Sequence, residues 1–161
     1  MKKVQTSLEP LFFEDVSVGD VYVSFGRTIT EADVVNFAGI SGDYNTLHTD
    51  AEFARNSIAG QRIAHGTLVL AISLGLCTRA PYNLAMMPNL RAMTQIRAWK
   101  FKKPVLFGDT IHVESEVVEK NDPGPERDSG SIVIRRTVRN QRGELVQEGE
   151  TKLLLRKQNH L

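Results

Sequence analysis

The sequence lacks the features that would cross-link the chain or hold it in a membrane. It has one cysteine, Cys77, so no disulfide bond can form within the chain, which fits a reducing compartment. Its longest apolar segment, Leu68 to Cys77, is interrupted by Ser73 and is too short to span a bilayer. No apolar stretch of the kind a signal peptide needs follows Lys2 and Lys3. These absences predict a soluble, cytoplasmic protein in which Cys77 is a buried structural thiol.

The chain also lacks an excess of charge of either sign. Its net charge of +1 gives no general field for holding nucleic acid, and no membrane contact is expected. The short basic stretch Lys100-Phe101-Lys102-Lys103 is either a solvated strand end or a site for a ligand phosphate. Because the chain has 161 residues and no internal repeat, residues 1–161 are predicted to form one domain, with a loose arm over the first ten residues.

Capping signals predict two short helices in the first half of the chain. Thr30 is a good N-cap, and Asp33 three residues later completes a capping-box pattern, so a helix is expected from Glu31 to about Gly39. Asp50 can cap a second short helix that begins at Ala51.

A longer segment, from Gly66 to about Thr78, is apolar on all sides and predicts a helix that is buried all round. The rest of the chain alternates apolar and polar residues, which is typical of half-buried strands. The predicted strands lie within Val16–Phe25 (after a turn), Arg91–Phe101, Ile111–Val117, Ile132–Val138 and Leu145–Leu155. Short turns join the last of these, so the sheet should be antiparallel and should curl round the buried helix, an α+β fold.

Polar residues concentrate in the segment Ala38–Asp50, just past a predicted helix end. Asp43 and His48 are close enough to face one cavity and to hold a water molecule between a carboxylate and an imidazole. Such a pair can remove a proton from water and return one to carbon, as the hydration of a double bond requires. A second interpretation stays open, in which Asp43 and Asn45 form an Asx-type turn and His48 is a surface residue.

The segment Ile63–Thr67 leads directly into the predicted buried helix. Gly66 would lie at the helix N-terminus, where free N–H groups and the positive end of the dipole can hold an oxyanion that develops on a thioester carbonyl. Alternatively, Gly66 only eases the turn into the helix. His65 and Thr67 flank it and are the candidate substrate-binding residues, and the His65 side chain is also expected to brace the loop.

These segments resemble the MaoC-like dehydratases, the (R)-specific enoyl-CoA hydratases, whose signature is Gly-Asp-x-Asn-Pro-[Leu/Ile]-His-x-Asp. The matching positions in this chain are Gly42, Asp43, Asn45, Leu47, His48 and Asp50. Ala64–Gly66 resembles a second block of the family and Phe101–Thr110 a third, and the similarity runs from about Phe12 to Leu155.

The resemblance implies a hot-dog fold, in which an antiparallel sheet wraps a long central helix. It also implies hydration of a trans-2-enoyl-CoA to the (R)-3-hydroxyacyl-CoA, and the reverse dehydration. Asp43 and His48 would activate the water, Asn45 would orient the site, and the Gly66 N–H would polarise the thioester carbonyl. No metal and no other cofactor is implied. The implied partners are the acyl-CoA substrate and further copies of the chain, in a homodimer or a higher homo-oligomer.

The chain departs from the family pattern at two places. Thr46 stands where the family has proline, which would stiffen the loop. Some members place a serine about two turns into the central helix, where this chain has Leu74. Ser73 is adjacent, and we do not count it as catalytic.

Three alternatives to this function stay open from the sequence. A hydratase for a branched or dicarboxylic enoyl-CoA, such as mesaconyl-CoA, would need a basic residue facing the acyl carboxylate, for which Arg79, Arg91 and Arg97 are candidates. A hot-dog thioesterase or a non-catalytic acyl-CoA-binding subunit would share the fold. The acyl pocket is expected to be walled by residues 79–90 and by the central helix, and Met86 and Met87 either line it or are ordinary packing residues.

Overall fold

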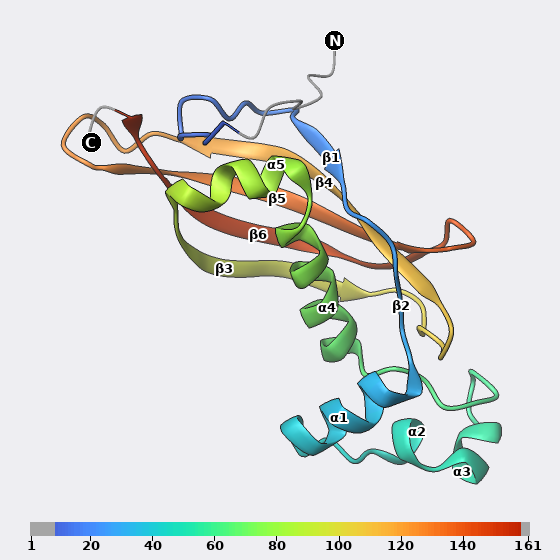
Figure 1. Ribbon diagram of the computed structural model, residues 1–161. Helices are drawn as coiled ribbons and strands as arrows, with labels where there is room; N and C mark the ends of the chain where they lie inside the picture. Colours follow the sequence, from blue (N-terminus) through green and yellow to red (C-terminus); the bar gives the residue numbers. More distant parts are fainter. Residues whose placement is uncertain (1–8, 159–161) are drawn as a thin grey trace.

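The computed structural model describes residues 9–158, so the arm expected over the first ten residues lies almost wholly outside the described part. Its main element is an antiparallel sheet with the strand order β1-β4-β5-β6-β3, and β2 adds to β4 (Figure 1). The strands are β1 (Val21–Val23), β2 (Arg27–Thr28), β3 (Leu90–Phe101), β4 (Thr110–Asn121), β5 (Ser129–Asn140) and β6 (Leu145–Arg156). The predicted strands and the antiparallel α+β arrangement are therefore confirmed, and the two-residue strand β2 was not predicted.

Helix α4 (Gly66–Thr78) lies against one face of this sheet, and its bounds agree with the prediction (Figure 1). The prediction that it is buried all round is wrong for the chain alone. Leu68, Val69, Ser73, Leu76 and Cys77 are buried. An opposite stripe of small side chains is exposed because the sheet covers only one side of the helix; the stripe comprises Thr67, Ala71, Gly75 and Thr78.

Three short helices form a lobe beyond the N-terminal end of α4: α1 (Glu31–Ser41), α2 (Thr46–Thr49) and α3 (Ala51–Arg55) (Figure 1). The predicted capping box of α1 is confirmed. The Asp33 N–H donates to Thr30 Oγ1 at 3.3 Å, and the Thr30 N–H donates to Asp33 Oδ2 at 2.8 Å. The helix runs two residues past the predicted Gly39 and ends at Gly42, whose φ of 75° lies in the left-handed region that glycine tolerates.

Helix α5 (Pro81–Met86) and the 3₁₀ turn Met87–Asn89 connect α4 to β3 along the same face of the sheet. Apolar residues form two buried clusters, one beneath α5 and one beneath α4. Met86 belongs to the first cluster and is 2% exposed, so it is a core residue.

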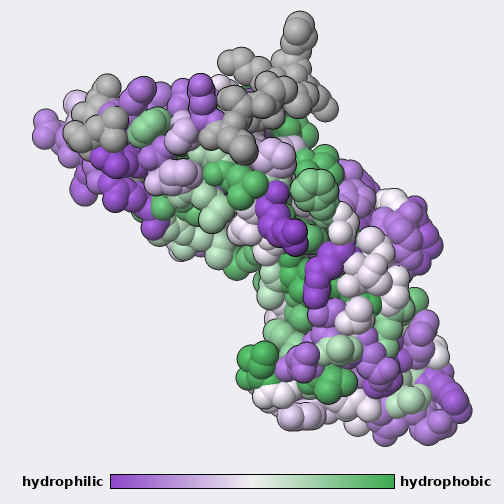
Figure 2. All heavy atoms as spheres, viewed as in Figure 1, coloured by the Kyte–Doolittle hydropathy of each residue, from purple (hydrophilic) through white to green (hydrophobic). Residues whose placement is uncertain are grey.

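Apolar and polar side chains separate clearly on the surface (Figure 2). Apolar residues gather around α4, polar residues cover the far end of the sheet, and the helical lobe carries both kinds. Among the described residues, no single helix is long and apolar enough to span a membrane. Only α4 together with residues 81–89 meets that criterion by length and composition, as a pair bent by 71°.

Candidate active site

The turn after α1 places Asp43 at the junction between the helical lobe and the start of α4. Gly42 reverses the chain, and the Asn45 N–H donates to Asp43 Oδ1 at 3.2 Å, as in an Asx-type turn. The backbone carbonyl of Asp43 accepts a hydrogen bond from His65 Nε2 at 2.9 Å. Asp43 is therefore held by hydrogen bonds to both its side chain and its backbone, and these fix where its carboxylate lies.

His48 is carried by α2, a one-turn helix that the sequence did not predict. Asn45 is the N-cap of this helix, and its Oδ1 accepts the Leu47 N–H at 3.0 Å. His48 Nδ1 lies 2.8 Å from the carbonyl oxygen of Ile63. A carbonyl only accepts, so Nδ1 carries the proton and Nε2 of the neutral ring is left as an acceptor. This tautomer suits a base that takes a proton from water.

His65 is almost completely buried, with 1% of its surface exposed. Its Nε2 donates to the Asp43 carbonyl, and its ring stacks on the His48 ring with centroids 3.8 Å apart and planes 32° apart. Phe37 packs on the other side at 5.1 Å. His65 therefore braces both Asp43 and His48. Although His65 was a candidate substrate-binding residue, it does not line the cavity described below.

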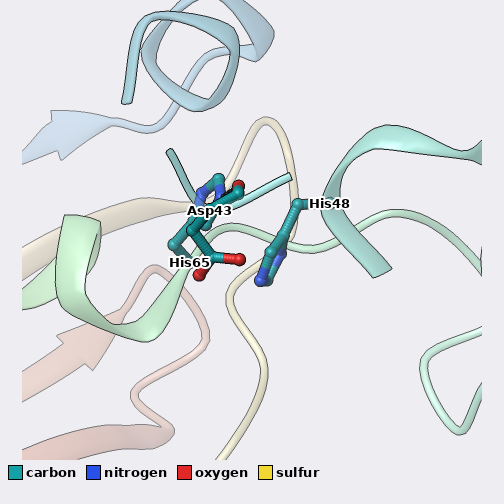
Figure 3. Close-up of side chains that lie close together, drawn as sticks. All are labelled: Asp43, His48 and His65. Carbon is teal, nitrogen blue, oxygen red and sulfur yellow. Dashed lines mark hydrogen bonds between the residues drawn. The ribbon is translucent and has the colours of Figure 1, made fainter. Parts of the chain in front are cut away.

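The carboxylate of Asp43 points toward the His48 ring (Figure 3). One carboxylate oxygen of Asp43 and one ring nitrogen of each of His48 and His65 lie within 4.8 Å of one another. One water molecule can bridge groups at that separation with two ordinary hydrogen bonds. Aspartate and histidine are also ligands for divalent transition metals, and each of the two rings bonds a backbone carbonyl through one nitrogen only, His48 through Nδ1 and His65 through Nε2.

A cavity of about 510 Å³ opens beside this pair. Asp43 and His48 line it together with the start of α4 and the segment that follows β3. Its other lining residues include Ile58, Ile63, Gly66, Thr67, Val69, Phe101, Lys102, Lys103, Val105 and Gln147. The spacing-based prediction that Asp43 and His48 face one cavity agrees with this geometry, and Gly66 and Thr67 lie there too.

Gly66 and Thr67, the first two residues of α4, line this cavity. The N–H groups of the first turn of a helix have no acceptor within the helix, and the positive end of the helix dipole adds to their field. The Gly66 Cα lies directly under the Phe101 ring, so that a Cβ added there would be 2.8 Å from its carbon atoms. Glycine at residue 66 therefore leaves room for the Phe101 ring beside these donors.

Asn45 does not line the cavity, so any influence it has on the site passes through the start of α2. Residues 79–90, which were predicted to wall the acyl pocket, do not line this cavity either, and Met86 among them is packed in the core. None of the three candidate arginines lines it either. Arg91 pairs with Asp128, and Arg97 pairs with Glu119 and Glu150 on the sheet.

The basic residues on the cavity wall are Lys102 and Lys103, each of which is paired with a glutamate. Lys102 lies 3.0 Å from Glu148, and Lys103 lies 2.9 Å from Glu144. Hydrogen bonds from Asn140, Lys103 and Arg142 lower the pKa of Glu144 to about 2. The Lys102 hydrogen bond lowers the pKa of Glu148.

Gln147 is a site residue that the sequence reasoning missed. It is 2% exposed, lines the cavity and donates from Nε2 to the Gly66 carbonyl at 2.9 Å. A signal was present, because Gly149, Thr151, Leu153 and Leu155 alternate along the predicted half-buried strand within Leu145–Leu155. Gln147 continues that face, where a polar residue is unusual.

Comparison with known proteins gives the same family as the sequence motif. The family model described as "MaoC like domain" matches residues 16–137. An (R)-specific enoyl-CoA hydratase of Rhodospirillum rubrum is 34% identical over 145 residues, which cover 89% of this chain and 91% of that protein. Protein MaoC of Klebsiella aerogenes is 39% identical over 106 residues, which make up 63% of this chain and only 29% of that longer protein.

Solved structures agree on the fold. The MaoC-like dehydratase from Rhodospirillum rubrum superposes with a TM-score of 0.80 at 30% identity, covering 92% of this chain and 98% of that one. A Mycobacterium tuberculosis protein with a double hotdog fold superposes with a TM-score of 0.79 at 24% identity, covering 94% of this chain and 46% of that one. The antiparallel sheet and its helix are thus a hot-dog fold, as predicted.

Proposed function

Because the chain belongs to the MaoC-like dehydratase family, a family of hydro-lyases, we propose that it hydrates a trans-2-enoyl-CoA to the (R)-3-hydroxyacyl-CoA and catalyses the reverse dehydration. One observation carries the proposal. Asp43 and His48 converge on one end of a cavity whose wall also contains the N-terminus of α4.

The proposed hydration uses the Asp43 carboxylate and His48 Nε2. A water molecule held between the Asp43 carboxylate and His48 Nε2 is placed for its oxygen to attack carbon 3 of the enoyl group. One proton leaves the water for this acid–base pair, and one proton passes from the pair to carbon 2, so the pair ends the reaction as it began. Asn45 and His65 hold the two groups in position.

The N-terminus of α4 supplies the second requirement. Attack on carbon 3 moves negative charge onto the thioester oxygen, and the Gly66 N–H would stabilise that oxyanion, with Thr67 beside it. Lys102 and Lys103 at the cavity wall offer positive charge for the phosphates of CoA, which supports an acyl-CoA substrate. Within residues 9–158 no arginine lines this wall to bind a second carboxylate, so a dicarboxylic substrate is not favoured.

The test is the loss of enoyl-thioester absorbance when the protein is mixed with crotonyl-CoA and with longer trans-2-enoyl-CoAs. We expect turnover with a product of R configuration, and a loss of about 10²–10⁴-fold in kcat for Asp43→Asn and for His48→Gln. Glu52→Gln is the matched control, since this exposed carboxylate on α3 pairs with Arg55 outside the cavity. Release of free CoA thiol would indicate a thioesterase instead, and binding without turnover would indicate a non-catalytic subunit.

We also propose that residues 1–161 act as one domain in the cytoplasm, and that two copies pair through β3. In the described chain β3 pairs with β6 alone, which leaves its other edge open. Most of its twelve residues are exposed, including Leu90, Met93 and Ile96. An edge strand of this length and apolarity is suited to pairing with a second strand.

A further inference from the structure

Gln147 makes two hydrogen bonds that tie together parts of the chain far apart in sequence. Its Nε2 donates to the Gly66 carbonyl at 2.9 Å, and its Oε1 accepts from Trp99 Nε1 at 3.0 Å. An indole N–H can only donate and a carbonyl can only accept, so only one orientation of the amide satisfies both. Trp99 therefore decides which end of the Gln147 amide faces Gly66.

The position of Trp99 depends on two unusual features of the sheet. The β3–β6 register shifts between Arg97 and Lys100, and Ala98 within this bulge has a φ of 49°, which is strained for a residue with a side chain. On the neighbouring strand, a Cβ at Gly149 would lie 2.4 Å from the Trp99 ring. A bulge and a missing side chain together let the indole lie flat over β6 and reach Gln147.

The Gly66 carbonyl belongs to the first peptide unit of α4. In a trans peptide the carbonyl of Gly66 and the N–H of Thr67 point in opposite directions within one plane, so a bond that fixes the carbonyl also fixes that N–H. Accepting a hydrogen bond also polarises the amide and makes its N–H a stronger donor. The Phe101 ring lies against Gly66.

From these contacts we infer that Gln147 is a positioning residue for the hydration: it holds the first peptide of α4 so that the Thr67 N–H, next to that of Gly66, faces the thioester oxygen, and Trp99 sets its orientation. The inference rests on the proposed function. It goes beyond the acid–base pair because it gives Gln147, a residue of β6, a role in positioning the donors to the thioester carbonyl. A purely structural role would lower stability without changing how the bound carbonyl is polarised.

The experiment compares Gln147→Met, Gln147→Glu and Trp99→Phe with the native chain. Gln147→Met removes both hydrogen bonds at similar volume, and Gln147→Glu keeps the acceptor for Trp99 but turns a carboxylate oxygen toward the Gly66 carbonyl. We expect kcat to fall about 10²–10³-fold for both, with KM within about threefold of native, because the lost interaction acts mainly in the transition state. Trp99→Phe should give a smaller fall, and Gln158→Met, an exposed glutamine near the end of β6, should give none.

A second readout does not depend on turnover. A conjugated 2,4-dienoyl-CoA should absorb at longer wavelength when bound to the native chain, because donors at its carbonyl polarise the whole conjugated system. We expect Gln147→Met and Trp99→Phe to bind this probe with a smaller shift, and circular dichroism checks that each variant is folded. An unchanged shift in the folded variants, or no shift with the native chain, would overturn the role of Gln147. Absence of turnover by the native chain would instead count against the proposed function, and the shift would still decide the role of Gln147.

Discussion

Two glycines on α4 have contrasting surroundings, which allows a matched pair of substitutions. A Cβ at Gly66 would lie 2.8 Å from the Phe101 ring, whereas a Cβ at Gly75 would meet nothing within 4 Å. We expect Gly66→Ala to lower kcat/KM at least about tenfold, because the methyl group displaces Phe101 and occupies the approach to the N–H donors. Its effect on thermal unfolding should be small, since the Phe101 side chain is 57% exposed and free to move.

Gly75→Ala is the control for this prediction. Alanine in the middle of a helix is more favourable than glycine by about 0.8–1 kcal/mol, so this variant should unfold at a higher temperature and keep full activity. Steady-state kinetics and thermal unfolding of both variants test the pair. A fully active Gly66→Ala enzyme would show that close approach to residue 66 is not needed.

At the residue scale, the sequence could predict which side chains come together but not how each is used. The spacing of Asp43 and His48 was enough to place both at one cavity. The free nitrogen of His48 was not predictable, because it is decided by a hydrogen bond to the Ile63 carbonyl, fifteen residues away. The buried stack of His65 on His48 likewise depends on tertiary packing.

At the scale of elements, α2 begins at the one signature position that departs from the family pattern. Thr46 is the first residue of α2, and Asn45 before it has φ −53° and ψ 136°, a conformation that a following proline accepts. Because an N–H at the first helical position has no acceptor in the helix, Thr46→Pro removes no helical hydrogen bond. We expect it to stabilise the chain by about 0.4–1 kcal/mol, without loss of activity.

The adjacent position supplies the control. The Leu47 N–H donates to Asn45 Oδ1, so Leu47→Pro removes the capping bond of α2 and should lower both stability and activity. Thermal unfolding measures the difference, at about 2–4 °C per kcal/mol for a chain of this size. If Thr46→Pro unfolds at a lower temperature than the native chain, the loop does not have the preorganised geometry described here.

The long elements were predictable from the sequence, and so were two short ones, α3 through its Asp50 cap and β1 within Val16–Phe25, but the other short elements were not. Strands β3 to β6 have twelve residues each, so their alternation repeats several times, and α4 is a continuous apolar segment. In contrast, α2 has four residues, β2 has two and α5 has six, too few for a period to show. These short elements are fixed by caps and by contacts with the rest of the fold.

At the scale of the whole molecule, the open edge of β3 predicts an assembly of two chains. We expect the native protein to have the mass of a dimer by light scattering, and Met93→Lys to shift the population toward monomer, because a charge then replaces an apolar side chain that is 48% exposed on β3. Val18→Lys is the matched control, near the opposite edge of the sheet and 59% exposed. A native chain that remains monomeric over a wide concentration range would contradict the prediction.

The outward side chains of the sheet are largely ion pairs, which argues that this face stays in water. Arg135 pairs with Glu116 and Arg139 pairs with Glu114, all partly or fully exposed. Charged, mutually paired side chains are depleted at the centres of protein interfaces. Pairing through the edge of β3 leaves this face free.

The burial of the single sulfhydryl has a practical consequence. Cys77 is 2% exposed on the buried face of α4, so the folded protein offers almost nothing for a disulfide reagent to react with. Colour that develops in a mixture of enzyme, acyl-CoA and such a reagent therefore reports liberated coenzyme, even at high enzyme concentration. In a sample of enzyme alone, the rate at which the reagent develops colour measures how often the core opens and exposes Cys77.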